Sequence, residues 1–294
     1  MREGPGIVPL VLGAGGMLGR AVAEVLEEDF PGTVSATRAE ADVTDRFRLE
    51  AEVERLRPDV VLNCAAYTDV DGCEIDRDRA RRVNAEGAGN AALAAAAAGS
   101  RIIHVSTDFV FDGRGTRPYT EDDAPAAICE YGRTKLEGER RVAASNADHL
   151  IVRTSWLYGA GRGNFVDAIR SRAANGGALR VVDDQFGSPT YVRDLAAALA
   201  RLLRREVRGL VHFANAGVCS RLEMAREILA AGEGRAVTLV PIKTAEAGRI
   251  AVRPAYSALD VSRYERLVGA SPRPWREALR DYLGGGARGT GGPS

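Results

Sequence analysis

The chain has 294 residues, of which 45% are hydrophobic and 27% charged, a size and composition that exclude a short peptide module and a largely disordered protein. Its 40 basic side chains balance its 40 acidic ones, so it carries no broad positive field of the kind that binds nucleic acid, and we expect a small-molecule partner instead. The sequence shows neither a secretion signal nor a run approaching about 18 apolar residues, so we expect no membrane partner and a cytoplasmic location.

Short β-branched runs alternate with helical patterns through the first half of the chain. We expect strands at Leu10–Leu12, Val34–Ala36, Val60–Leu62, Arg101–Ser106 and Leu150–Val152. Pro9 is placed at the first residue of the first strand because it lacks an N–H. We expect helices at about Leu18–Glu28, Phe47–Leu56, Asp76–Ala98 and Tyr131–Ala144. This order predicts an α/β fold of the Rossmann type, with a doubly wound parallel sheet.

The pattern changes in the second half of the chain. After about Trp156 the alternation loosens into loops and isolated helices, as expected if the chain leaves the sheet to build a smaller cap over the carboxyl ends of the strands. Residues 284–294 are rich in glycine, and we expect a disordered tail there. The four cysteines show no CxxC spacing and are interpreted as free thiols, so neither a disulfide framework nor a zinc site is expected.

A glycine-rich turn follows the first predicted strand and opens the first predicted helix. Gly13 allows the tight turn, Gly16 lets a pyrophosphate approach the backbone, and Gly19 lets helix and strand pack closely. Glycine-rich turns are common, but one between a strand and a helix favours dinucleotide binding. The expected cofactor contacts in this turn are Gly13, Gly16, Met17, Leu18 and Gly19.

The end of the second predicted strand bears on the choice of dinucleotide. A site that prefers NAD places an acidic residue there for the ribose 2′-hydroxyl, but this sequence has Arg38. Arg38 suits the 2′-phosphate of NADP, and its alternative is a solvated surface arginine. We expect Asp42 and Val43 to lie at the adenine edge.

A phenol and an ammonium lie four residues apart on one predicted helix, at Tyr131 and Lys135. A tyrosine exchanges protons near neutral pH only if a cation stabilises its phenolate, and Lys135 is placed to do so. This spacing also arises by chance on amphipathic helices. The fourth predicted strand ends in the segment from His104 to Asp108, where a hydroxyl could hydrogen-bond a substrate carbonyl.

Two other kinds of site are disfavoured by the sequence. His104, Ser106 and Asp108 alternate along one strand and lack a GxSxG elbow, which argues against a hydrolase triad. The three histidines are scattered without the spacing of metal ligands, so we expect no metal site.

Six segments, taken with the glycine turn and the Tyr-x3-Lys pair, resemble the dTDP-4-dehydrorhamnose reductase family of the extended short-chain dehydrogenase/reductase superfamily. The similarity extends in family order from about Leu10 to Leu283. The segments are PDVVLNCAAYTDVD from Pro58, STDFVFDG from Ser106, YGRTK from Tyr131, RTSWLYG from Arg153, DDQFGSPT from Asp183 and RPAYSALD from Arg253.

The resemblance implies an enzyme that reduces the C4 ketone of dTDP-4-dehydro-L-rhamnose to dTDP-L-rhamnose with NADPH or NADH. It implies an NAD(P)-binding Rossmann domain over residues 1–155, to which the chain returns near 185–212 and 256–262. Residues 156–283 then mainly form a discontinuous substrate-binding domain. Some family members bind Mg²⁺ and dimerise; no magnesium ligands are identifiable here, and both a monomer and a homodimer stay open.

The resemblance also implies roles for individual residues. Tyr131 would protonate the C4 alkoxide, Lys135 would hold the nicotinamide ribose and lower the pKa of Tyr131, and Thr107 would bind the same oxygen. On the substrate side, Asp108 would contact the sugar and Trp156 would lie along its ring, although core filling is the alternative for the indole. Further contacts are Arg253 at the diphosphate, with a structural salt bridge as its alternative, and Ala65, Ala66, Tyr67 and Thr68 at the cofactor.

Departures from the family pattern leave two alternative functions open. Phe109 replaces a usual tyrosine, and Cys129 and Ala127, both just before Tyr131, replace a frequent asparagine and a proline. One alternative is a reductase of a related dTDP-4-keto-6-deoxysugar, such as a dihydrostreptose precursor. The other is a non-catalytic NADP-binding regulatory subunit, resembling that of methionine adenosyltransferase. The presence of the tyrosine, lysine and threonine together argues against a pure binding module.

Overall fold

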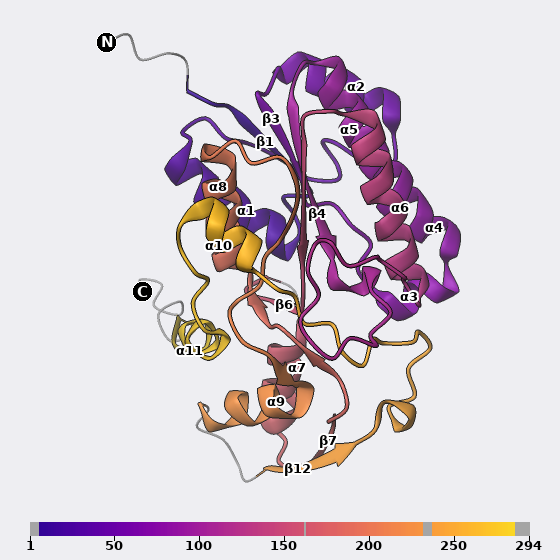
Figure 1. Cartoon of the computed structure of the whole chain (residues 1–294), viewed down its shortest axis with the longest axis vertical. Coiled ribbons are helices and arrows are strands. Elements are labelled where there is room, and N and C mark those ends of the chain that lie inside the picture. Colours follow the sequence, from indigo (N-terminus) through magenta and orange to yellow (C-terminus); the bar gives the residue numbers. More distant parts are fainter. Residues whose placement is uncertain (1–5, 162, 232–236, 286–294) are drawn as a thin grey trace, which may run out of the picture.

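A six-stranded parallel sheet forms the upper half of the protein in the computed structural model, which describes residues 6–161, 163–231 and 237–285 (Figure 1). The strand order is β10-β5-β4-β3-β1-β2, and every neighbouring pair is parallel. The strands are β1 (Pro9–Leu12), β2 (Val34–Ala36), β3 (Val60–Asn63), β4 (Arg101–Thr107), β5 (His149–Thr154) and β10 (Gly209–His212). The expected doubly wound parallel sheet is confirmed, and Pro9 begins its first strand as predicted.

Helices cover both faces of this sheet, because apolar side chains alternate between the faces along each strand. Val11 packs on one side with α1 (Met17–Asp29), α8 (Val192–Arg204) and α10 (Ser262–Val268). Leu10 and Leu12 pack on the other side, which is covered by α2 (Arg46–Leu56), α5 (Gly87–Ala97) and α6 (Glu130–Ser145). The strand order reverses between β1 and β3, where α/β proteins of this class bind ligands.

The helical stretch expected at residues 76–98 is divided by a turn of π-helix. It comprises α4 (Arg77–Arg81), the π-turn Arg82–Glu86 and α5, and it follows the short helix α3 (Val70–Ile75). Asn84, in the π-turn, accepts a hydrogen bond from the backbone of Tyr67 at 2.8 Å and donates to Thr134 Oγ1 at 3.2 Å. The π-turn thereby joins the loop after β3 to α6, and such turns are frequent at functional sites.

A second group of elements lies below the carboxyl ends of the sheet strands and has its own apolar core (Figure 1). Tyr158, Leu179, Met224 and Trp275 are buried in that core. Its helices are α7 (Phe165–Ala173), α9 (Arg221–Ala230) and α11 (Trp275–Gly285), and its longer strands are β7 (Gly177–Val182) and β12 (Val237–Ile242). Two small sheets pair β6 (Leu157–Tyr158) with β9 (Thr190–Tyr191), and β8 (Phe186–Gly187) with β11 (Cys219–Ser220).

The helix α11 reaches Gly285, two residues into the glycine-rich segment that we expected to be disordered. The rest of that segment, residues 286–294, lies outside the described residues. None of the described helices combines the length and the hydrophobicity needed to cross a bilayer.

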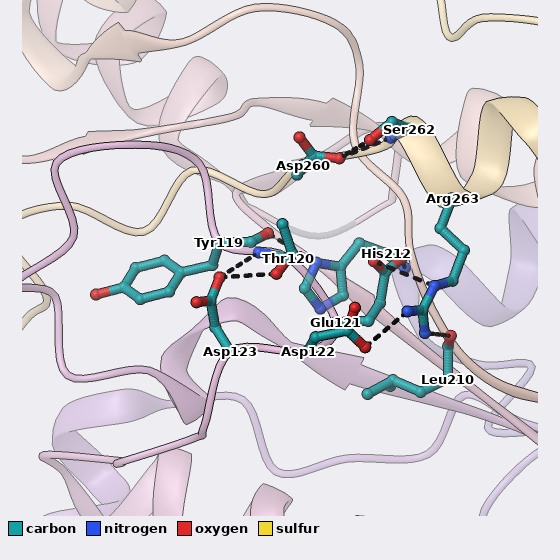
Figure 2. A network of polar contacts seen from close by, with 10 residues as sticks. All are labelled: Tyr119, Thr120, Glu121, Asp122, Asp123, Leu210, His212, Asp260, Ser262 and Arg263. Atoms are coloured by element: carbon teal, nitrogen blue, oxygen red, sulfur yellow. Dashed lines mark hydrogen bonds and ion pairs between the residues drawn. The ribbon is translucent and has the colours of Figure 1, made fainter.

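The long segment between β4 and α6 is fastened to the edge strand β10 and to α10 (Figure 2). His212 Nδ1 donates to the carbonyl oxygen of Tyr119 at 3.0 Å, and the backbone N–H of His212 donates to Glu121 Oε1 at 2.8 Å. Arg263 forms an ion pair with Asp122 at 2.8 Å. These bonds fix a segment whose two ends carry the residues Thr107 and Tyr131.

A buried ion pair joins α6 to β5. Arg153 Nη2 lies 2.7 Å from Glu139 Oε2, and both side chains are almost fully buried. We expect Glu139→Gln to lower the free energy of unfolding by about 3–5 kcal/mol, because it leaves the guanidinium buried without its counter-charge. Chemical denaturation measures this loss of stability.

Glu137→Gln is the matched control, because its partners Arg81 and Arg141 lie at the surface. We expect it to lower the free energy of unfolding by about 0–1 kcal/mol. Equal losses of stability in the two variants would contradict the prediction.

Candidate active site

Most of the residues singled out from the sequence lie at one edge of the sheet, where the parallel strands end. The turn after β1 holds Gly13, Gly16, Met17, Leu18 and Gly19; the loop after β2 holds Arg38, Asp42 and Val43; and the loop after β3 holds Ala65, Ala66, Tyr67 and Thr68. Thr107 ends β4 and is followed by Asp108; Trp156 follows β5; Tyr131 and Lys135 lie on α6; and Arg253 lies in the loop before α10.

The glycine turn has the close backbone packing that its sequence predicts. Gly13 has a φ of 77°, and a Cβ there would lie 2.7 Å from the backbone nitrogen of Ala65. A Cβ on Gly19 would collide with the carbonyl oxygen of Gly13. Gly16 caps α1 without a side-chain hydrogen bond, so the first N–H groups of the helix are free to meet an anion, while the Leu18 side chain is buried in the core.

The loop after β2 presents a cation beside this turn. Arg38 is 73% exposed on its side chain and pairs through Nε with Asp42 Oδ2 at 2.8 Å. Val43 is buried in the core, and its carbonyl oxygen accepts from Asn90 at 2.9 Å. The Arg38 guanidinium is therefore exposed enough to face a phosphate if it shares or leaves Asp42, whereas Val43 can meet a cofactor only through its backbone.

Tyr131 lies in the first turn of α6, close to the end of β4. A Cβ at the next residue, Gly132, would collide with the carbonyl oxygen of Phe109, so glycine is required for this approach. The rings of Tyr131 and Phe109 meet edge to face at 5.5 Å. We expected Lys135 to lower the pKa of Tyr131, but in the free protein burial raises it and the hydrogen bond with Thr107 is the main opposing effect. Tyr131 is therefore a neutral phenol, the form that donates a proton.

Lys135 is buried below the end of β4. Its Nζ donates to the carbonyl oxygen of Val105 at 2.7 Å and lies 3.2 Å from His104 Nε2. Burial lowers the pKa of Lys135 to about 8, opposed by the Glu139 carboxylate. From the sequence we interpreted His104 as a structural residue. The signal that points to it is register, because His104 lies directly opposite Asn63 on the neighbouring strand.

Thr107 and Asp108 form a hydroxyl and carboxyl pair next to Tyr131. Thr107 Oγ1 donates to Asp108 Oδ1 at 3.0 Å and accepts from the backbone N–H of Phe109 at 3.2 Å. Asp108 is 1% exposed, and burial raises its pKa to about 6 although hydrogen bonds from Ser257 and Thr107 oppose the shift. The carboxyl group is therefore held in a position that disfavours its ionised form.

The raised pKa of Asp108 should make the free energy of unfolding depend on pH. Asp108 ionises less readily in the folded protein than in the unfolded chain. Its ionisation therefore lowers the free energy of unfolding progressively as the pH rises from about 4 through 6. We expect Asp108→Asn to raise the free energy of unfolding by about 3 kcal/mol at pH 8 and to have little effect below pH 4, as measured by denaturation across pH. Asp112→Asn is the control with the opposite sign, because hydrogen bonds from Arg114 and Tyr119 lower the pKa of Asp112. A gain for Asp108→Asn that does not depend on pH would contradict the prediction.

Trp156 has an unusual backbone and a charged neighbour. Its φ of 46° is rare for a residue with a side chain. A Cβ on Gly187 would lie 2.5 Å from Trp156 Cε2, and the Arg221 guanidinium lies 3.4 Å from the centre of the indole ring. The ring is only partly buried at the edge of the lower core, so it does not simply fill that core.

Arg221 is a functional candidate that we did not identify from the sequence. It is partly buried, its guanidinium has no ion pair among the described residues, and burial lowers its pKa to about 10, so it stays charged at neutral pH. The carboxylate of Asp108 opposes that shift, which places Arg221 near the residues at the end of β4. No motif contains this arginine; only its position at the start of α9 could have indicated it.

Arg253 is engaged in a structural salt bridge, which was the alternative to a role at the diphosphate. Its Nη1 lies 3.0 Å from Asp71 Oδ1 and also donates to the carbonyl oxygen of Ala251. This ties the loop before α10 to α3. Within the described residues, no three His, Cys, Asp or Glu side chains gather in a way that could hold a metal ion.

Comparisons with known proteins agree with this geometry. The family model described as the RmlD substrate binding domain matches residues 9–286. The dTDP-4-dehydrorhamnose reductase of Mycolicibacterium smegmatis is 43% identical over 279 residues, which are 93% of this chain and 84% of that protein. The dTDP-4-keto-6-deoxy-D-glucose reductase of Streptomyces niveus is 38% identical over 275 residues, 92% of this chain and 94% of that protein. The solved structure of dTDP-4-dehydrorhamnose reductase from Bacillus anthracis in complex with NADP superposes on this chain with a TM-score of 0.91. The two sequences are 35% identical, and the match covers 95% of this chain and 99% of that one.

Proposed function

The chain belongs to the dTDP-4-dehydrorhamnose reductase family, and from that premise we propose that it reduces the C4 ketone of dTDP-4-dehydro-L-rhamnose to dTDP-L-rhamnose. The observation that carries the proposal is the meeting of a neutral phenol, a buried lysine and a hydroxyl at one edge of the sheet: Tyr131, Lys135 and Thr107. These are the groups needed to deliver a proton to a carbonyl oxygen as it gains charge.

In the proposed mechanism each catalytic residue acts on the C4 oxygen or on its proton. NADPH, when bound, supplies the hydride. Tyr131 gives its hydroxyl proton to the C4 oxygen, and Thr107 stabilises the charge that develops there by a hydrogen bond. Thr107 engages Asp108 in the free protein, so its hydroxyl must turn toward the substrate. Lys135 stabilises the phenolate that Tyr131 becomes.

We propose that the turn after β1 and the loops after β2 and β3 hold the cofactor. The close contacts of Gly13 and Gly19 and the uncapped start of α1 fit a pyrophosphate. A structure with NADP in a relative of the same family supports this cofactor. The division into a cofactor-binding domain over residues 1–155 and a mainly substrate-binding domain over 156–283 belongs to the same proposal.

Arg38 gives this cofactor proposal a specific test. We expect Arg38→Ala to weaken NADPH binding about tenfold and NADH binding little, because only NADPH carries a 2′-phosphate for a charged hydrogen bond. Titration with each dinucleotide measures the two affinities. Arg46→Ala, an exposed arginine on α2 paired with Glu50, is the control. Equal losses for the two dinucleotides would contradict a role for Arg38 at the 2′-phosphate.

On the substrate side we propose that Asp108 and Trp156 contact the sugar and that Arg221 and Arg253 supply positive charge for the diphosphate. Arg221 stacks on Trp156 and has no ion-pair partner among the described residues, whereas Arg253 already pairs with Asp71. A guanidinium of this kind matches phosphate oxygens. Of the two arginines, Arg221 is the one free to take up such a contact.

The alternative substrate is another dTDP-4-keto-6-deoxysugar, favoured by the identity with the Streptomyces niveus reductase. Initial rates with dTDP-4-dehydro-L-rhamnose and with dTDP-4-keto-6-deoxy-D-glucose, each with NADPH, test the choice. We expect a higher kcat/KM for the first sugar. Turnover of only the second sugar would overturn the proposed substrate, and binding of NADPH without turnover of either would favour a regulatory subunit.

A further inference from the structure

A chain of buried polar groups runs from the loop after β3 to Lys135, and its direction can be deduced from its first bond. The backbone N–H of Ala65 can only donate, and it meets Asn63 Oδ1 at 3.1 Å. The Asn63 oxygen is therefore the acceptor, and its amide nitrogen is the atom that faces His104 Nδ1 at 3.2 Å. Asn63 and His104 are both 1% exposed, so bulk solvent does not reach either side chain.

The orientation of Asn63 fixes the tautomer of His104. An amide nitrogen only donates, so His104 Nδ1 must accept. Burial and the nearby Lys135 lower the pKa of His104 well below its ordinary value, so the ring is neutral and carries a single proton. That proton lies on Nε2, the nitrogen that faces Lys135 Nζ at 3.2 Å.

An N–H aimed at Lys135 Nζ requires a lone pair on that nitrogen, which an ammonium group lacks. We propose that His104 is a positioning residue that donates a hydrogen bond from Nε2–H to the neutral amine of Lys135 and so stabilises the deprotonated lysine. The bond from Nζ to the carbonyl oxygen of Val105 is compatible with an amine, which keeps two N–H groups.

The charges around Lys135 are compatible with a neutral amine at this residue. The Glu139 carboxylate, one turn along α6, favours the ammonium, but it is engaged by Arg153. Cys64, after β3, is a neutral thiol whose pKa burial raises to about 12, and Tyr131 is a neutral phenol. No fixed negative charge other than Glu139 contributes to the pKa of Lys135 among the described residues.

The chemical consequence rests on the proposed reductase function. When Tyr131 gives its proton to the substrate oxygen, its O–H bond breaks and a phenolate remains. Lys135, as an ammonium, gives a proton to that phenolate and becomes the amine that His104 stabilises; water later returns the proton to Lys135. His104 thus stabilises the neutral amine of Lys135, which makes the loss of the proton from the Lys135 ammonium more favourable.

Nitrogen NMR of the free protein tests the proposal without substrate, so its result is independent of whether the proposed activity is correct. The chain has three histidines. His149 and His212 face backbone carbonyl oxygens through Nδ1, at 2.7 and 3.0 Å, and should be Nδ1–H tautomers. We expect His104 to be the Nε2–H tautomer. An Nδ1–H tautomer at His104 would overturn the proposal, and no substitution is needed for this measurement.

A second measurement follows the lysine itself. The chain has two lysines, Lys135 and Lys243, so isotope-labelled lysine gives two signals, which Lys243→Arg assigns. The substitution Asn63→Leu removes the amide that donates to His104 Nδ1, so the His104 proton can move to Nδ1. His104 Nε2 can then accept a hydrogen bond from the Lys135 ammonium, and we expect the pKa of Lys135 to rise by about one unit. Unchanged His149 and His212 signals serve as the fold control. A midpoint that stays or falls would overturn the proposal.

Discussion

Replacing Tyr131 with phenylalanine is expected to lower kcat by about 10³-fold, within the 10²–10⁴ that a positioned proton donor contributes, and to leave NADPH affinity nearly unchanged. The phenol is the neutral group next to Thr107 at the end of β4, and its loss removes the proton without removing the ring. The Phe109 ring packs edge to face against Tyr131 and can hold a phenyl ring in the same place. Steady-state rates and a separate dinucleotide titration measure the two effects.

Tyr264→Phe is the matched control for this substitution. Tyr264 lies on α10 and is buried in the core on the other side of the sheet, so Tyr264→Phe removes the same hydroxyl away from the proposed site. We expect its kcat to stay within about twofold, since no step of the mechanism uses it. An active Tyr131→Phe enzyme would remove Tyr131 as the proton donor and leave Thr107 as the remaining hydroxyl at that oxygen.

Lys135→Met is expected to lower kcat/KM by about 10³-fold and, unlike Tyr131→Phe, to weaken cofactor binding as well. Methionine matches the length of the lysine stem but lacks the nitrogen that we propose stabilises the phenolate and holds the ribose. Lys243→Met is a natural control, because Lys243 is exposed and pairs with Asp183 at the surface. Rates of the two variants with saturating NADPH, together with their dinucleotide affinities, check the prediction. Equal activity of the two variants would contradict a role for Lys135.

The sheet and the cofactor turn follow from the sequence because they are built from local signals. Apolar runs with period two, Pro9 at a strand start and the glycines of the first turn each act within a few residues, and all are realised in the structure. The π-turn around Asn84 was missed, since nothing in an alanine-rich helical pattern marks where one extra residue enters a turn.

Tyr131 and Lys135, the proposed catalytic pair, could be predicted because they share a helix face, whereas their neighbours depend on packing between distant segments. His104 reaches Lys135 across 31 positions, and Arg221 meets Trp156 only because α9 packs below the sheet. The pKa of Tyr131 was predicted in the wrong direction for the free protein. Spacing shows which charges lie near a group, but burial, which dominates here, follows from the complete fold.

Transfer of a hydride to C4 of the sugar can be followed with NADPH that is deuterated at its transferable C4 position. The labelled cofactor is incubated with dTDP-4-dehydro-L-rhamnose and the purified protein, and the sugar product is examined by NMR. We expect dTDP-L-rhamnose with deuterium at C4, formed one for one with oxidised cofactor, and none with Tyr131→Phe over the same time. Unchanged substrate, or a reduced product without deuterium at C4, would contradict this expectation.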